Sequence, residues 1–179
     1  YRRATMSFIE TERLIICPFE RHHLTETYVS WLNDKSVCEF NGHRHFPYTM
    51  AKAESYLEYI SKASALIVVA LHQKSDNAHI GNASIGDIDF LNSSATLNIL
   101  IGEKESWGKG YAFEAGKKAI QDALYRRNLN ATVEHGKGLG LYDVSYTILS
   151  NSLVSIIIPT KDYADITEQC LKSLFEKTT

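Results

Sequence analysis

The chain has 179 residues, of which 44% are hydrophobic and 22% charged, and its formal net charge at pH 7 is −2. This composition predicts one globular domain with a sizeable core, and so small a net charge argues against a nucleic-acid partner or attraction to an anionic membrane. No apolar run is long enough to span a membrane, and the three cysteines show neither metal-ligand spacing nor an even count, so we expect a reduced, cytoplasmic protein.

The N-terminal third of the sequence predicts a strand followed by two helices. Apolar residues predict a strand over 13–19, and apolar residues at helical spacing predict a helix over 24–33. The polar and aromatic stretch over 38–49 is typical of a loop. Thr49 is a favourable N-cap for a second helix over 50–62.

The middle of the chain predicts three strands and a helix. Apolar strands over 65–71 and 80–89 flank a polar turn at 73–78, which indicates a hairpin. A further strand is predicted over 95–102, and an Ala-rich segment over 111–127 has the composition of a helix. The predicted order is therefore βααβββα.

Two glycines, Gly108 and Gly110, stand between the strand over 95–102 and the helix over 111–127. Glycine lets the backbone approach an anion closely, and the start of the helix presents unpaired N–H groups and the positive end of its dipole. A strand, a glycine loop and a helix in this order predict a binding site for a diphosphate group.

The segment Trp107-Gly-Lys-Gly-Tyr-Ala112 resembles the acetyl-CoA loop of the GNAT superfamily of N-acetyltransferases. Residues 10–19, 31–34 and 80–86 are similar to segments of its ribosomal-protein and amino-sugar branch. The resemblance covers residues 7–130. It implies an α/β (α+β) fold with a GNAT-like mixed central sheet and flanking helices, and an atypical C-terminal part.

The resemblance also implies that acetyl-CoA is the co-substrate. In the family, backbone amides of the loop hold the cofactor, and a backbone N–H of the preceding strand stabilises the oxyanion that develops on the thioester carbonyl. The residues implied to contact acetyl-CoA are Leu100, Ile101, Trp107, Gly108, Lys109, Gly110, Tyr111 and Ala112.

The acceptor amine must lose a proton before it attacks the thioester, so a carboxylate or histidine should lie near it. Asp87 is our candidate for the catalytic base, and Glu39, His43 and Asp89 are candidates for acceptor binding. Ordinary surface charge explains each of them equally well. We expect no metal, because the paired histidines of the sequence lack cysteine or carboxylate partners near them.

A second group should give a proton to the departing thiolate, and in the family a tyrosine commonly does so. Tyr142 and Tyr146 are our catalytic candidates for this role, with packing as the alternative for both.

The sequence after residue 130 departs from the family pattern. Residues 131–152 read as a junction, with a flexible glycine-rich stretch at 136–140, and apolar stretches at 142–148 and 153–158 could supply strands to the main sheet. Residues 153–179 resemble the start of a family-2 inverting glycosyltransferase, and apolar residues at helical spacing predict a helix over 165–176. In that family, residues matching Pro159, Thr160 and Asp162 bind the nucleotide base, but no metal motif follows. We therefore expect a structural role for this segment.

These predictions divide the chain into a tag or disordered stretch (1–6), an acetyltransferase domain (7–130), a junction (131–152) and a glycosyltransferase-like fragment (153–179). The expected function is N-acetylation of a small amine, with an amino sugar or sugar nucleotide of surface-polysaccharide synthesis as the best guess. Two alternatives stay open: acetylation of a protein N-terminus, and a CoA-binding module with impaired catalysis. A homodimer is also left open.

Overall fold

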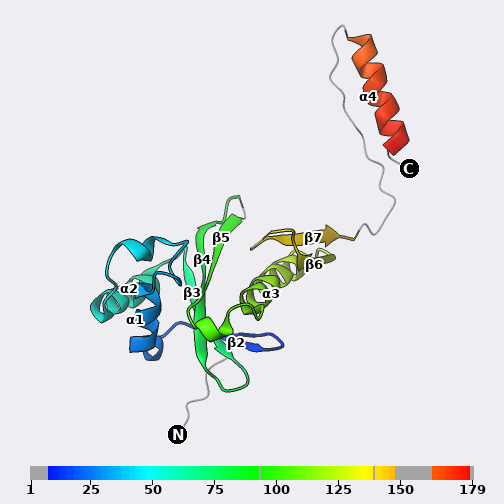
Figure 1. The fold of residues 1–179 in the computed structure, drawn as a ribbon. Helices are drawn as coiled ribbons and strands as arrows, with labels where there is room; N and C mark the ends of the chain where they lie inside the picture. Colours follow the sequence, from blue (N-terminus) through cyan, green and yellow to red (C-terminus); the bar gives the residue numbers. More distant parts are fainter. Residues whose placement is uncertain (1–7, 93, 139, 148–162, 178–179) are drawn as a thin grey trace. The chain divides into compact units, whose positions relative to one another are not determined.

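The computed structural model describes residues 8–92, 94–138, 140–147 and 163–177, apart from two side chains at 43 and 44, and the chain divides into two compact units (Figure 1). Each unit is described by itself. The first, Tyr1–Thr147, contains β1 (Ile9–Glu10), β2 (Leu14–Pro18), η1 (Arg21–His23), α1 (Glu26–Asn33), η2 (Gly42–His45), α2 (Met50–Lys62), β3 (Ile67–Gln73), β4 (His79–Asp89), β5 (Ser94–Ile101), η3 (Lys104–Ser106), α3 (Tyr111–Arg126), β6 (Ala131–His135) and β7 (Tyr142–Tyr146). The second, Ile148–Thr179, contains α4 (Ala164–Lys177).

Five strands form an antiparallel sheet in the order β1-β2-β3-β4-β5. The hairpin predicted from the sequence is confirmed as β3 and β4, and β5 pairs with β4 in the register Ser84↔Asn98 and Asn82↔Leu100. Among the described strands β5 is the last of this sheet, so one of its edges has no strand partner.

Helices cover both faces of the sheet, with α1 and α2 on one face and α3 on the other (Figure 1). Successive side chains of a strand point to opposite faces. Cys17 and Ala70 accordingly belong to the core under α1 and α2, whereas their neighbours Ile16 and Leu71 belong to the core under α3. The predicted α/β architecture with flanking helices is confirmed.

Both N-terminal helices begin at threonine caps. The Thr49 hydroxyl accepts the Lys52 N–H at 3.3 Å, and α2 has the bounds that the sequence predicts. The Thr25 hydroxyl accepts the Tyr28 N–H at 3.1 Å, so α1 begins at Glu26 rather than at Leu24. The short η1 occupies the preceding turn.

Three histidine rings gather inside the first unit, below α1. The ring centroids of His23, His72 and His79 lie 5.1–5.2 Å apart. Burial, and then the neighbouring histidines, lower the pKa of His23 to about 3. Burial also lowers the pKa of His79 to about 4, so both rings are neutral near pH 7.

The segment after α3 forms a hairpin of β6 and β7, joined by a closed turn in which the Gly136 N–H donates to the Leu141 carbonyl at 3.0 Å. The sequence suggested that residues 142–148 could extend the main sheet, but β7 pairs with β6 in a separate two-stranded sheet. The short turn makes pairing with the preceding strand local, which costs less chain entropy than joining a distant edge.

The second unit confirms one helix of the sequence prediction. We expected a helix over 165–176, and α4 occupies Ala164–Lys177. The strand predicted over 153–158, and the candidate residues Pro159, Thr160 and Asp162, lie outside the described residues. Within the described ranges, no helix has the length and apolar character needed to cross a membrane.

Candidate active site

Gly108 and Gly110 adopt left-handed backbone conformations, with φ of 70° and 80°. An L side chain in this conformation costs about 1–2 kcal/mol, so the loop geometry itself favours glycine. A Cβ added at Gly108 would meet no atom within 4 Å. The loop backbone therefore borders open space that a ligand can enter.

Gly110 is the N-cap of α3, and its carbonyl accepts the Glu114 N–H at 3.0 Å. Among the described residues, the backbone N–H groups of residues 108–112 have no hydrogen-bond partner. These donors and the positive end of the helix dipole lie together at the start of α3. The arrangement is suited to a diphosphate, which accepts several hydrogen bonds and carries negative charge.

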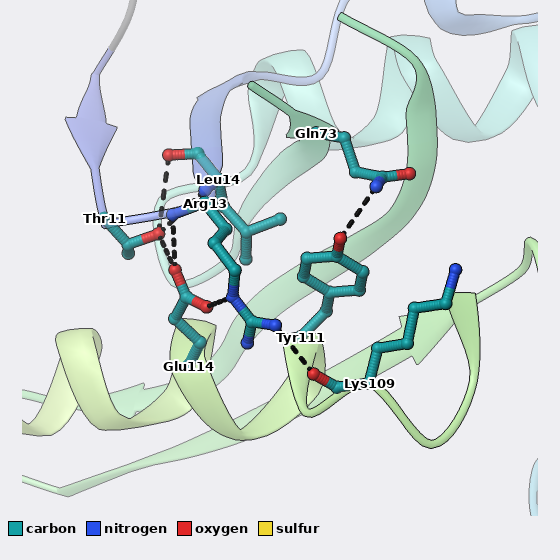
Figure 2. A network of polar contacts seen from close by, with 7 residues as sticks. All are labelled: Thr11, Arg13, Leu14, Gln73, Lys109, Tyr111 and Glu114. Carbon is teal, nitrogen blue, oxygen red and sulfur yellow. Dashed lines mark hydrogen bonds and ion pairs between the residues drawn. The ribbon is translucent and has the colours of Figure 1, made fainter. Parts of the chain in front are cut away.

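Figure 2 shows how the loop is held to the sheet. The Glu114 carboxylate accepts hydrogen bonds from the Thr11 hydroxyl, from the Arg13 N–H at 2.8 Å and from Arg13 Nε at 2.7 Å. Arg13 Nη1 donates to the Lys109 carbonyl at 2.9 Å. Burial alone would raise the pKa of Glu114, but these hydrogen bonds hold it below its usual value. Glu114 is thus ionised when it binds Arg13.

A second set of contacts positions Tyr111, the first residue of α3. Its ring lies 4.6 Å beneath the Arg13 guanidinium, and its hydroxyl accepts a hydrogen bond from Gln73 Nε2 at 2.7 Å. Because the ring is buried and its hydroxyl is paired, Tyr111 anchors the loop to β3. In Figure 2 the Lys109 side chain extends away from Arg13, so its ammonium group does not belong to this anchor.

The Trp107 indole N–H donates to the Ile101 carbonyl at 2.8 Å, which ties the loop to the end of β5. In an antiparallel strand the N–H and C=O of one residue point to the same side. The Gly102 N–H donates to Ile80 on β4 at 3.0 Å, and the Leu100 carbonyl closely approaches Gly81 on β4. The N–H of Ile101 therefore faces the free edge of β5, and that of Leu100 faces β4.

A cleft of about 810 Å³ lies beside this edge, between β4, β5, α1, α2 and the segment after α1. It brings together predicted cofactor residues and one predicted acceptor residue: Leu100, Ile101, Trp107 and Glu39. Glu39 is exposed. The open cleft thus places a carboxylate in the same space as the end of β5.

Two tyrosines form a pair in the wall of the cleft. The rings of Tyr28 and Tyr48 are nearly perpendicular, with centroids 6.3 Å apart, and their hydroxyls share a hydrogen bond. Burial raises the pKa of both phenols, so they are neutral and can act as donors near pH 7. They give the cleft a wall that is apolar in its rings and polar at its tips.

Sequence reasoning missed several polar residues that line the cleft, and three of them belong to the sheet: Asn82, Ser84 and Asn98. They lie on one face because Ser84 is opposite Asn98 and Asn82 is opposite Leu100. A detectable signal existed, since Asn82 and Ser84 occupy alternate positions of a predicted strand and therefore share a face.

The other predicted acid–base residues lie elsewhere. Asp87 is exposed at an irregularity of β4, with φ of 50°, and Asp89 accepts hydrogen bonds from the N–H groups of Leu91 and Asn92 in the adjoining turn. Neither lines the cleft. The backbone of His43 lies in η2, and its side chain is outside the described part of the chain.

Tyr142 lies against the first turns of α3. Its hydroxyl is 3.5 Å from the Ala112 carbonyl and occupies the space left by the absent side chain of Gly116. Its ring stacks on Phe113, and burial raises the pKa of its phenol. Tyr146, four residues further along β7, is 60% exposed and does not share these contacts.

Comparisons with known proteins show the family and agree with the fold. The family model for the acetyltransferase (GNAT) domain matches residues 13–136. The fold is similar to spermidine N-acetyltransferase from Vibrio cholerae in complex with CoA and spermine (19% identity, 69% of this chain and 70% of that one, TM-score 0.56) and to a GNAT-family acetyltransferase from Bacillus anthracis (18%, 70% and 70%, 0.55). It is also similar to the microcin C7 self-immunity acetyltransferase in complex with acetyl-CoA and AMP (15%, 76% and 92%, 0.53). No curated protein sequence matches the chain significantly.

Proposed function

Since the chain belongs to the GNAT acetyltransferase family, we propose that it transfers the acetyl group of acetyl-CoA to the amine of a small polar acceptor, an amino sugar or a sugar nucleotide. The observation that carries the proposal is that the glycine loop and the acceptor cleft share a residue. Trp107 belongs both to the glycine loop and to the wall of the cleft, so a diphosphate on the loop and an acceptor in the cleft would be neighbours.

The loop residues have defined parts in this reaction. The N–H groups of residues 108–112 would hold the diphosphate of acetyl-CoA, and the Lys109 ammonium would add a positive charge beside it. The Ile101 N–H, on the free edge of β5, would donate to the thioester carbonyl oxygen as negative charge develops there. Leu100 would then contact the co-substrate through its side chain only.

The acceptor amine begins as an ammonium ion and must lose a proton before it can attack. Glu39 is the carboxylate of the cleft and would take this proton, directly or through water. Collapse of the tetrahedral adduct breaks the C–S bond, and Tyr142 would give its phenolic proton to the departing sulfur. Asp87 and Asp89 have less support for a role because they do not line the cleft, and Tyr146 has less support because it does not share the contacts of Tyr142 with α3.

The charge of the cleft supports a hydroxylated acceptor with a single amine over a polyamine. Glu39 is the sole acid, and Lys52 the sole cation, among the described residues that line it. A polyamine carries several positive charges and needs several carboxylates. The asparagine, serine and tyrosine groups of the cleft instead match the hydroxyls and apolar ring faces of a sugar.

The test is release of free CoA thiol from acetyl-CoA over a panel of amino sugars, nucleotide amino sugars, spermidine and peptides with free N-termini. The proposal expects turnover with an amino sugar, and a large loss of turnover in Glu39→Gln with acetyl-CoA binding unchanged. Turnover with spermidine or a peptide alone would assign a different acceptor. CoA binding without turnover on any amine would support the alternative of a catalytically impaired module.

We also propose that residues 7–147 form the catalytic unit and that 153–179 is a glycosyltransferase-like fragment without transfer activity of its own. The support is the division of the chain at Thr147, which assigns the glycine loop and the cleft to the first unit and residues 153–179 to the second. Titration with a nucleotide sugar and Mn²⁺ should give no saturable heat. A saturable signal that is lost in Asp162→Ala would contradict this assignment.

A further inference from the structure

Three buried side chains from three separate elements converge in the first unit, and none of them lines the cleft. Cys17 comes from β2, His23 from η1 and His72 from β3, and their exposed fractions are 1%, 2% and 6%. One nitrogen or sulfur atom of each lies within 4.8 Å of the other two. The proposed acetyl transfer uses none of them.

The two distances from His23 Nε2 match edges of a metal coordination shell, and the ligand atoms of Cys17 and His72 lie within 4.8 Å of each other. His23 Nε2 is 3.1 Å from His72 Nε2 and 3.7 Å from Cys17 Sγ. Zinc binds imidazole nitrogen at about 2.0–2.1 Å and thiolate sulfur at about 2.3 Å, so a tetrahedral site separates two nitrogens by about 3.3 Å and a nitrogen from a sulfur by about 3.6 Å. The separations from His23 therefore suit an ion bound by His23 and either neighbour, and the ion would draw Cys17 and His72 together to the tetrahedral edge.

The outer ring nitrogens have the partners that metal-binding histidines use. His72 Nδ1 is 3.0 Å from the Asn77 carbonyl, and His23 Nδ1 is 3.2 Å from the Glu20 carbonyl. A proton on each Nδ1 would donate to these carbonyls and leave both Nε2 lone pairs available to a metal. Such backbone contacts orient the ring and select the tautomer that binds metal.

The same atoms also permit a metal-free network. The Glu20 N–H lies 2.9 Å from His23 Nδ1 and can donate to it. His23 would then carry its proton on Nε2 and donate it to His72 Nε2. The two arrangements differ in the tautomer of His23, which can be measured.

We propose that Cys17, His23 and His72 bind one soft d10 cation, Zn²⁺ or Cu⁺, and that this ion fastens η1 to β2 and β3. On binding, the Cys17 S–H bond breaks, the proton passes to solvent and the thiolate becomes a ligand, while both imidazoles bind through neutral Nε2. Thiolate and imidazole together select these ions over Mg²⁺ or Ca²⁺. With Cu⁺ the site is neutral, and with Zn²⁺ it keeps one positive charge. Local sequence patterns do not predict such a site, because Cys17 and His72 meet only through the pairing of β2 with β3.

The test uses the full chain, freed of metal by unfolding with a chelator and refolded with Zn²⁺, or with Cu⁺ under reducing conditions. We expect one equivalent of metal per chain and a raised melting temperature. Cys17→Ala removes a direct ligand, so it should weaken binding by more than the roughly 10–100-fold that loss of an outer-shell partner costs. Cys38→Ala is the matched control, since Cys38 is also fully buried but its thiol donates to the Trp31 carbonyl instead.

Two spectroscopic readouts keep the proposal testable if Cys17→Ala does not fold. Co²⁺ in the wild-type protein should give a thiolate-to-metal charge-transfer band, and long-range ¹H–¹⁵N spectra should move the His23 proton from Nε2 to Nδ1 when Zn²⁺ binds. Binding of either ion with these signatures supports the site. A folded wild-type chain that takes up neither ion, or a Cys17→Ala protein that binds it equally well, would overturn the proposal in favour of the metal-free network.

Discussion

Arg13 and Glu114 are separated by 101 residues in the chain, yet Arg13 Nε lies 2.7 Å from Glu114 Oε2 (Figure 2). Glu114 belongs to the first turn of α3, and Arg13 immediately precedes β2. Arg13 also donates to the Lys109 carbonyl between the two loop glycines. This pair therefore holds the backbone of the loop in place while the loop amides remain free.

We expect Glu114→Gln to weaken acetyl-CoA binding several-fold and to lower the free energy of unfolding by about 1 kcal/mol. The expected loss of unfolding free energy is small because the Arg13 side chain is 44% exposed, so solvent screens the ion pair. Calorimetric titration and urea unfolding measure the two effects. Glu58→Gln, in the exposed Glu58–Lys62 pair, is the control and should change neither. Equal effects from both variants would show that Arg13 and Glu114 do not position the loop.

The same carboxylate makes stability depend on pH. Its folded-state pKa lies below the ordinary value of 4.5, so between these two values the unfolded chain binds more protons than the folded chain. The stabilisation from Glu114 is complete above about pH 4.5 and is lost as the pH falls through the folded-state pKa. Unfolding free energies of wild type and Glu114→Gln should therefore converge in acid. A difference that stays constant below pH 4.5 would contradict this.

The proposed acid role of Tyr142 separates it from Tyr146. Tyr142→Phe keeps the ring that packs on α3 but removes the only proton it can give, so kcat should fall by about a hundredfold, the lower end of general acid catalysis. Tyr146→Phe changes an exposed residue and should leave kcat unchanged. Steady-state kinetics at saturating acetyl-CoA compare the two. If both variants retain wild-type kcat, the thiolate leaves without help from either tyrosine.

Local signals carried the prediction of most elements. Thr49 marked the start of α2, and the two glycines marked the start of α3, because caps and left-handed turns depend on residues close in sequence. The Arg13–Glu114 pair was not predictable, since neither residue has a local feature that reveals the other. The proximity of Cys17 and His72 was not predictable either, because it arises from the pairing of strands that are distant in the sequence.

The candidate site was predicted only in part for the same reason. The glycine loop and the end of β5 are one continuous segment, so the residues assigned to acetyl-CoA lie together. The acid–base candidates were chosen by residue type alone. The structure shows that the Asp89 carboxylate stabilises the turn that follows it, because it accepts three hydrogen bonds from residues 91 and 92. Composition cannot distinguish such a turn carboxylate from a base in a cleft.

The claim that acetyl-CoA binds the glycine loop is tested most directly by calorimetric titration of Gly108→Val and Gly140→Val with acetyl-CoA. Both glycines have left-handed φ, 70° and 74°, and a Cβ at either would meet no atom within 4 Å, so the two substitutions impose the same backbone strain. Only the side chain at 108 would occupy the space beside the loop amides. We predict that Gly108→Val folds but no longer binds acetyl-CoA, whereas Gly140→Val binds like wild type. Unchanged affinity in a folded Gly108→Val protein would contradict the assignment of the loop.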